Sequence, residues 1–185
     1  MQNMWNYKKI SFILFLFVIT SFSKTYAQVK PDDAIRWYTI EQAEALSKKE
    51  KRKIFIDVYT SWCGWCKNME KTTFSQQYII KYINDNYYPV KLDAEQKSDI
   101  IFRSKTYRFV TQSGVGFNEL AAELLRGQMS YPTIIFLDED LNLIQTIPGF
   151  RAADQFEMIM TYFGEDNHKK MPWTKYEKTY QAMKK

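Results

Sequence analysis

The sequence predicts one α/β domain in which helices cover both faces of a mixed central β-sheet. Segments rich in β-branched and aromatic residues, such as 53–59 and 87–93, alternate with segments that carry an apolar stripe at helical spacing. This alternation is typical of layered α/β architectures. About 158 residues follow the first 27, without an internal repeat or a low-complexity linker, and that length suits one domain with a substantial core.

Residues 1–27 have the order of a secretory signal peptide. Lys8 and Lys9 precede an apolar run over 10–22, and a polar stretch then ends at Ala27. The apolar run is shorter than the roughly 20 residues that a membrane-spanning helix needs. We expect cleavage near Ala27, a periplasmic or secreted mature protein, and no stable membrane insertion after cleavage. An uncleaved membrane anchor is the alternative.

The charge and the cysteines narrow the function further. Removal of 1–27 takes away three lysines and no acid, so the formal charge falls from +5 to +2, and nucleic-acid binding is not expected. Both cysteines lie in a single Cys-x-x-Cys at Cys63 and Cys66, and so small a disulfide loop constrains the unfolded chain little. A zinc site needs about four ligands, whereas the chain offers these two thiols and His168, which is remote from them in the sequence. We therefore expect thiol chemistry without a metal or an organic cofactor.

The first half of the domain is predicted to hold three helices and two strands, after a short extended stretch at 35–38. Thr39 and Gln42 have the spacing of a capping box, and both strands are rich in β-branched and aromatic residues. The predicted elements are a helix from Thr39 to Lys51, a strand over 53–59, a helix over 64–71, a helix capped by Ser75 with Ile79, Ile80 and Ile83 on its apolar face, and a strand over 87–93.

The second half begins with a predicted β-hairpin over 100–112 that turns near Ser104 and Lys105. Its aromatic residues form either a small core beneath the hairpin, which we favour, or a protein contact; they are Phe102, Tyr107, Phe109 and Phe117. The elements expected after it are a helix from Asn118 that ends at Gly127, a strand over 134–137, a polar turn over 138–142, a strand over 143–147, a helix over 152–163 and a basic helical tail within 166–185.

The Cys-x-x-Cys lies where a buried strand is followed by a helix. A helix N-terminus offers free N–H groups and the positive end of the helix dipole, and both favour a thiolate. Cys63 would then be the nucleophile, and Cys66, about one helical turn later, would resolve the mixed disulfide. Of the flanking residues, we expect Trp62 to be packed and Trp65 to be partly exposed at the substrate side.

At this point the chain resembles the thioredoxin family. The run Ile56-Asp57-Val58-Tyr59-Thr60-Ser61-Trp62-Cys63-Gly64-Trp65-Cys66-Lys67 is similar to the strand and active-site motif of that family, and the resemblance extends over 35–163. It implies a three-layer sandwich with a mixed central sheet over 28–165, with 94–118 as an insertion. The Gly-Trp dipeptide between the cysteines departs from the Gly-Pro of the best-known members, and this leaves the redox direction open.

The resemblance also implies roles for other residues. Asp57 matches a buried acid that assists proton transfer to the second thiol, and Lys91 matches a lysine near that acid, although a solvated lysine is an equal alternative. Tyr131 and Pro132 are similar to the cis-proline loop that faces the disulfide. The other residues expected to contact substrate are Trp62, Gly64, Trp65 and Gly149.

The function expected from these features is a thiol-disulfide oxidoreductase that reduces or isomerises disulfides of exported proteins. A reductant outside the cytoplasm needs electrons, and a membrane thiol carrier is the expected donor. An oxidant that donates its disulfide is the second enzymatic interpretation. A peptide-binding module with an inert disulfide is the alternative from another class.

Overall fold

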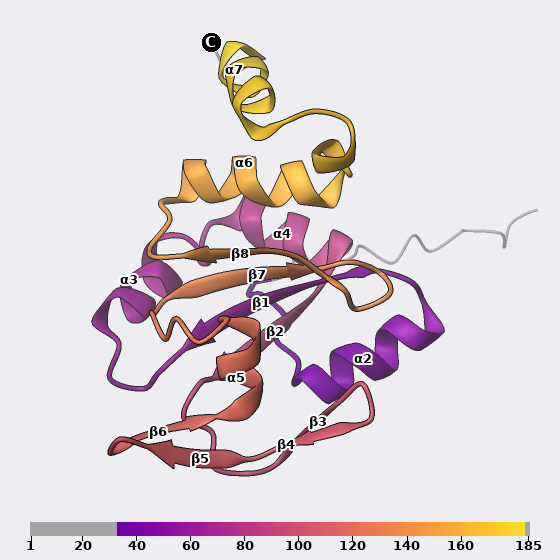
Figure 1. Cartoon of the computed structure of the whole chain (residues 1–185). Helices are drawn as coiled ribbons and strands as arrows, with labels where there is room; N and C mark the ends of the chain where they lie inside the picture. The colour runs from indigo at the N-terminus through magenta and orange to yellow at the C-terminus, as the bar shows by residue number, and fades with distance from the viewer. Residues whose placement is uncertain (1–32, 184–185) are drawn as a thin grey trace, which may run out of the picture. The chain divides into compact units, whose positions relative to one another are not determined.

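The computed structural model describes residues 33–183 (Figure 1). The predicted signal peptide, 1–27, lies outside the described residues. The helices are α2 (Ile40–Lys49), α3 (Gly64–Thr72), α4 (Gln77–Asn86), α5 (Glu119–Leu124), α6 (Ala153–Gly164), a 3-10 helix η1 (Asn167–Lys169) and α7 (Trp173–Met183). The strands are β1 (Lys53–Tyr59), β2 (Tyr87–Asp93), β3 (Ile100–Phe102), β4 (Lys105–Tyr107), β5 (Phe109–Gln112), β6 (Val115–Asn118), β7 (Thr133–Leu137) and β8 (Leu143–Pro148).

The central sheet has four strands in the order β2-β1-β7-β8. β1 pairs with β2 in parallel and with β7 antiparallel, and β7 pairs with β8 antiparallel. The sheet is therefore mixed, as predicted. In the parallel pair Asp57 lies opposite Lys91, so the side chains of these two residues emerge on the same face of the sheet.

Helices cover both faces of this sheet, which makes the three layers visible in Figure 1, with α4 and α6 on one side and α2 and α5 on the other. One core lies between the sheet and α2, α5 and the insertion, and includes Ile54 and Ile56 of β1. The other lies under α3, α4 and α6 and is rich in aromatic rings, with Phe55, Phe136 and Phe156 almost fully buried. The predicted fold class is confirmed.

Side chains cap the starts of α2 and α5, whereas α4 and α6 begin without a side-chain cap. Thr39 and Gln42 form the predicted capping box at α2, and the side chain of Asn118 accepts from Leu120 N–H at the start of α5. The prediction that Ser75 caps α4 is wrong. The Ser75 hydroxyl donates to the Lys71 carbonyl at the end of α3, and Gln76 is the N-cap of α4.

The insertion contains two hairpins, whereas the sequence pattern predicts one. The first joins β3 and β4, and its two turn residues, Arg103 and Ser104, both have positive φ. The second joins β5 and β6. Phe102 and Tyr107 belong to the core between the sheet and α2 and α5, so they extend that core instead of forming a separate one. Phe109 and Phe117 are half-buried.

The C-terminal helix α7 packs against α6. Tyr176 is buried between them, and its hydroxyl lies 2.8 Å from the Thr161 hydroxyl. The Tyr162 hydroxyl of α6 donates to the Met171 carbonyl at 2.7 Å, which holds the segment before α7. None of the helices within 33–183 is both long enough and apolar enough to cross a membrane.

Candidate active site

The two cysteines lie at the junction between β1 and α3 and form a disulfide. The S–S distance is 2.03 Å and the two Cα atoms are 5.3 Å apart. Cys63 is the N-cap of α3, and Cys66 lies in the first turn of this helix. Both are largely buried, so a partner can reach the disulfide only at its exposed margin.

The start of α3 favours negative charge on the first sulfur. The Cys66 N–H donates to Cys63 Sγ at 3.0 Å, so a backbone donor already points at this atom. The helix N-terminus adds the positive end of its dipole. Both effects stabilise a thiolate on Cys63 once the disulfide is reduced. The first turn of α3 contains no acid that would oppose them.

Asp57 is a carboxylic acid buried in the middle of β1, 1% exposed. It alternates with Ile56 and Val58 and therefore faces the aromatic core on the side of α3. Burial raises the pKa of Asp57, and the attraction of Lys91 opposes this rise in part. Its Oδ1 atom has no hydrogen-bond partner within 33–183. The acid thus has a free oxygen and an increased affinity for a proton.

Lys91 pairs with this acid at 2.7 Å, between Nζ and Asp57 Oδ2. The alternative of a solvated surface lysine is therefore wrong, because its side chain is only 18% exposed. Its ammonium group also lies 5.0 Å from the ring centre of Trp37 and 4.9 Å from that of Tyr59, close enough for cation–π attraction. At 3.6 Å it approaches the carboxylate of Glu70, which is 56% exposed. The pair is thus linked to the surface through Glu70.

The loop before β7 lies beside the motif. The Tyr131–Pro132 peptide is cis, and the Tyr131 ring packs edge-on against Trp62, with ring centres 5.9 Å apart. Burial, with smaller effects of nearby acids, raises the pKa of Tyr131 to about 12, so its hydroxyl is protonated at neutral pH. Gly149 has a φ of +91° and donates its N–H to the Pro132 carbonyl at 2.7 Å. A left-handed conformation of this kind favours glycine.

Two exposed tryptophans flank the disulfide. Trp62 is 64% exposed and Trp65 is 63% exposed, so the expectation that Trp62 is packed is wrong. Trp62 donates its indole N–H to Glu95 at 2.9 Å, and the Trp65 ring contacts Phe150, with centres 5.5 Å apart. We call these two tryptophans with Tyr131 and Phe150 the aromatic rim. The rim connects the Cys-x-x-Cys motif to the loop before β7 through Tyr131 and to the loop after β8 through Phe150.

The structure therefore brings most of the predicted site residues together, and it adds four that the sequence analysis missed: Trp37, Glu70, Glu95 and Phe150. Each of these four residues contacts a partner that is distant in sequence. Only Glu70 lies near the motif in the chain, one helical turn beyond Cys66, and its partner is Lys91. Gly64 is exposed, and a Cβ there would meet no atom within 4 Å, so packing does not require glycine. Within 33–183 no three His, Cys, Asp or Glu side chains are grouped to hold a metal.

Solved structures share this architecture. A protein described as DsbH oxidoreductase superposes with a TM-score of 0.50 at 19% identity, over 75% of this chain and 92% of that one. A thioredoxin from Thermus thermophilus gives 0.53 at 16% identity, over 70% and 87%. A thioredoxin-fold protein from Helicobacter pylori gives 0.55 at 13% identity, over 83% and 91%. At these identities the likeness shows a thioredoxin fold.

Curated relatives match in sequence over part of the chain. An uncharacterized protein of Caenorhabditis elegans is 31% identical over 130 residues, and spermatogenesis-associated protein 20 of Mus musculus is 33% identical over 84. The thiol:disulfide interchange protein DsbD of Yersinia enterocolitica is 29% identical over 114. The matches cover 69%, 45% and 60% of this chain but only 16%, 11% and 16% of those proteins. Residues 18–172 match the family Thioredox_DsbH, described as a protein of unknown function (DUF255), and the chain belongs to this family.

Proposed function

We propose that the chain is an extracytoplasmic thiol-disulfide oxidoreductase that reduces or isomerises disulfides of exported proteins through Cys63 and Cys66. The observation that carries the proposal is the disulfide at the N-terminus of α3, placed on the same side of the sheet as a buried acid with a raised pKa. The family and the likeness to DsbD support the same class of chemistry.

The reaction starts from the reduced pair. The Cys63 thiolate attacks one sulfur of a substrate disulfide, a mixed disulfide forms, and the other substrate sulfur leaves as a thiolate that takes a proton from water. The Cys66 N–H and the helix dipole hold the attacking charge. The flanking tryptophans and the cis-proline loop contact the substrate chain, together with Gly64 and Gly149.

The second step needs a base. Cys66 must lose its proton before it attacks Cys63 Sγ and releases the second substrate thiolate. Asp57 is the proposed acceptor, because its unpaired Oδ1 can take this proton and its raised pKa improves it as a base over an ordinary carboxylate. Lys91 opposes the rise of that pKa and so favours the ionised form of Asp57 before the transfer. Two electrons have then passed to the substrate, and the Cys63–Cys66 disulfide is restored.

A membrane thiol carrier is the proposed electron donor, since nothing outside the cytoplasm supplies reducing equivalents by default. The predicted leader, 1–27, supports export. The proposed protein partners are exported proteins with exposed disulfides, docked at the aromatic rim.

Trapping of the mixed disulfide tests the proposal. Reduced Cys66→Ser should accumulate a covalent complex with a disulfide-containing substrate such as insulin, because the resolving thiol is missing. Cys63→Ser should form none and should lose all insulin reduction. If insulin reduction survives in Cys63→Ser, the exchange mechanism is wrong. If the wild-type protein binds peptides but exchanges no disulfide, it is a binding module.

A further inference from the structure

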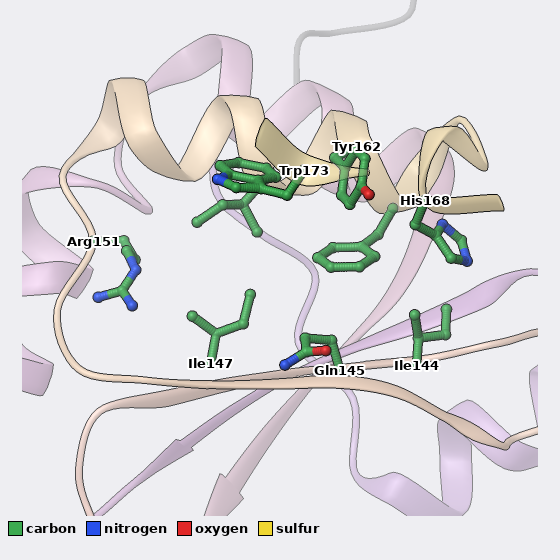
Figure 2. Close-up of a pocket in the computed structure, with 9 residues that line it drawn as sticks. Ile144, Gln145, Ile147, Arg151, Tyr162, His168 and Trp173 are labelled. Carbon is green, nitrogen blue, oxygen red and sulfur yellow. The ribbon is translucent and has the colours of Figure 1, made fainter. Parts of the chain in front are cut away.

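A cavity of about 600 Å³ lies apart from the disulfide, between the edge strand β8 and the C-terminal part of the chain. Figure 2 shows its floor on β8, with Ile144, Gln145 and Ile147, and its opposite wall with Tyr162 and Trp173. Arg151 and His168 lie at opposite ends. Cavities of roughly 300–1,000 Å³ are the size that small ligands occupy. None of the proposed redox residues lines it.

The walls of this cavity are mostly apolar. Ile159 and Phe163 of α6 are largely buried, and the isoleucines of the floor and Trp173 are half-buried. The Tyr162 hydroxyl is engaged by the Met171 carbonyl, so this residue offers mainly its ring to the cavity. A ligand here would bury an apolar body among aliphatic and aromatic side chains.

One end of the cavity carries an uncompensated positive charge. The Arg151 guanidinium donates to the carbonyls of Phe150 and Pro148 at 2.8 and 3.0 Å, and both partners are neutral. None of the residues that line the cavity is acidic, and the partners of the guanidinium described within 33–183 are these two carbonyls. Burial lowers the pKa of His168 at the other end, so its ring is neutral at pH 7. A single cation thus faces an otherwise uncharged cavity.

From this arrangement we propose that the cavity binds an amphiphilic carboxylate, with the carboxylate on Arg151 and an apolar body between β8 and α6. A guanidinium binds a carboxylate through charge-assisted hydrogen bonds, and its fork geometry suits the two oxygens. The apolar body displaces water from the isoleucines and from Trp173. This site is independent of the proposed redox reaction.

Calorimetric titration with three probes tests the proposal on the full chain. Decanoate, below its micelle-forming concentration, carries both parts of the ligand, decanol carries the body alone and acetate the head alone. We expect decanoate to bind at least about tenfold tighter than either, since a charge-assisted contact and apolar burial each contribute that much. From hexanoate to decanoate, each methylene should tighten binding by up to about fourfold.

Variants locate the binding. Arg151→Met removes the charge, and Ile144→Trp fills the floor of the cavity; each should weaken decanoate binding at least about tenfold. Arg108→Met and Ile101→Trp make the same changes at exposed positions of the insertion and should leave binding unchanged. Circular dichroism and thermal melting confirm that each variant is folded. Equal binding of decanol, or unchanged affinity in Arg151→Met, would overturn the proposal, as would no binding of decanoate.

Discussion

Replacing Asp57 with asparagine should make the protein more stable and less active at the same time. The side chain keeps its shape and loses its charge. Attraction between unit charges 2.7 Å apart, the distance from Asp57 to Lys91, is about 6 kcal/mol at an effective dielectric of about 20. Removal of both charges from water costs several kcal/mol for each. Because the pKa of Asp57 is raised, the cost of burial exceeds the attraction.

Each unit by which the folded pKa exceeds the unfolded value corresponds to about 1.4 kcal/mol of lost stability in the ionised state. We therefore expect Asp57→Asn to raise the free energy of unfolding at pH 7. Lys91 then keeps Glu70 at 3.6 Å and part of its side chain in water, so its charge is not left without a partner. The upward direction of the Asp57 pKa shift determines how the stability difference between the two proteins changes with pH. Below the unfolded pKa both proteins carry a neutral side chain, so the difference vanishes, and it grows as pH rises through the folded pKa.

Urea unfolding of the oxidised proteins at pH 4 and pH 7 measures this difference. Asp140→Asn, which neutralises an exposed carboxylate, is the control and should change stability by no more than about 0.5 kcal/mol at either pH. In stopped-flow exchange, Asp57→Asn should slow the resolving step by roughly 10²-fold, the lower range for a lost general base. Lower stability of Asp57→Asn at pH 7, or an unchanged resolving rate, would refute the reasoning.

Other changes separate stability from function. Lys91→Met leaves the carboxylate of Asp57 unpaired, and urea unfolding at pH 7 should show a loss of about 3 to 5 kcal/mol that shrinks in acid. Trp62→Ala and Trp65→Ala remove exposed rings, so the melting temperature should hold while KM for insulin rises in steady-state assays. Tyr176→Ala should cost about 3 to 5 kcal/mol, and hydrogen exchange should show the loss of protection first in α7. Unchanged KM in both tryptophan variants would contradict a docking role for the rim.

Much of the fold follows from local sequence patterns. β1 and β2 begin and end where predicted, because runs of β-branched and aromatic residues fill strands that are buried on both faces. The second hairpin was missed although Ser113 and Gly114 form a turn signal, both with positive φ. The misplaced cap at Ser75 shows the limit of such rules, since its hydroxyl found an acceptor in the preceding helix.

The residues of the site that lie in one continuous motif could be predicted from the sequence. The contacts between residues that only the fold brings together could not. The cysteine pair and Asp57 belong to a continuous strand-to-helix run, and the sequence indicates their relation. The contact of Trp65 with Phe150 and the bond from Trp62 to Glu95 join residues far apart in the chain. No local pattern predicts these contacts, and they explain why Trp62 is held in place and yet exposed.

The equilibrium redox potential of the Cys63–Cys66 pair tests the central claim most directly. It is measured by titration of the protein in dithiothreitol and glutathione buffers, with Cys63→Ser as the control. Related folds range from roughly −270 mV for reductants to about −120 mV for strong oxidants. We predict a value near the reducing end, as a protein that reduces exported disulfides requires. A value near the oxidising end would contradict the direction, and a pair that does not exchange at all would contradict the enzymatic function itself.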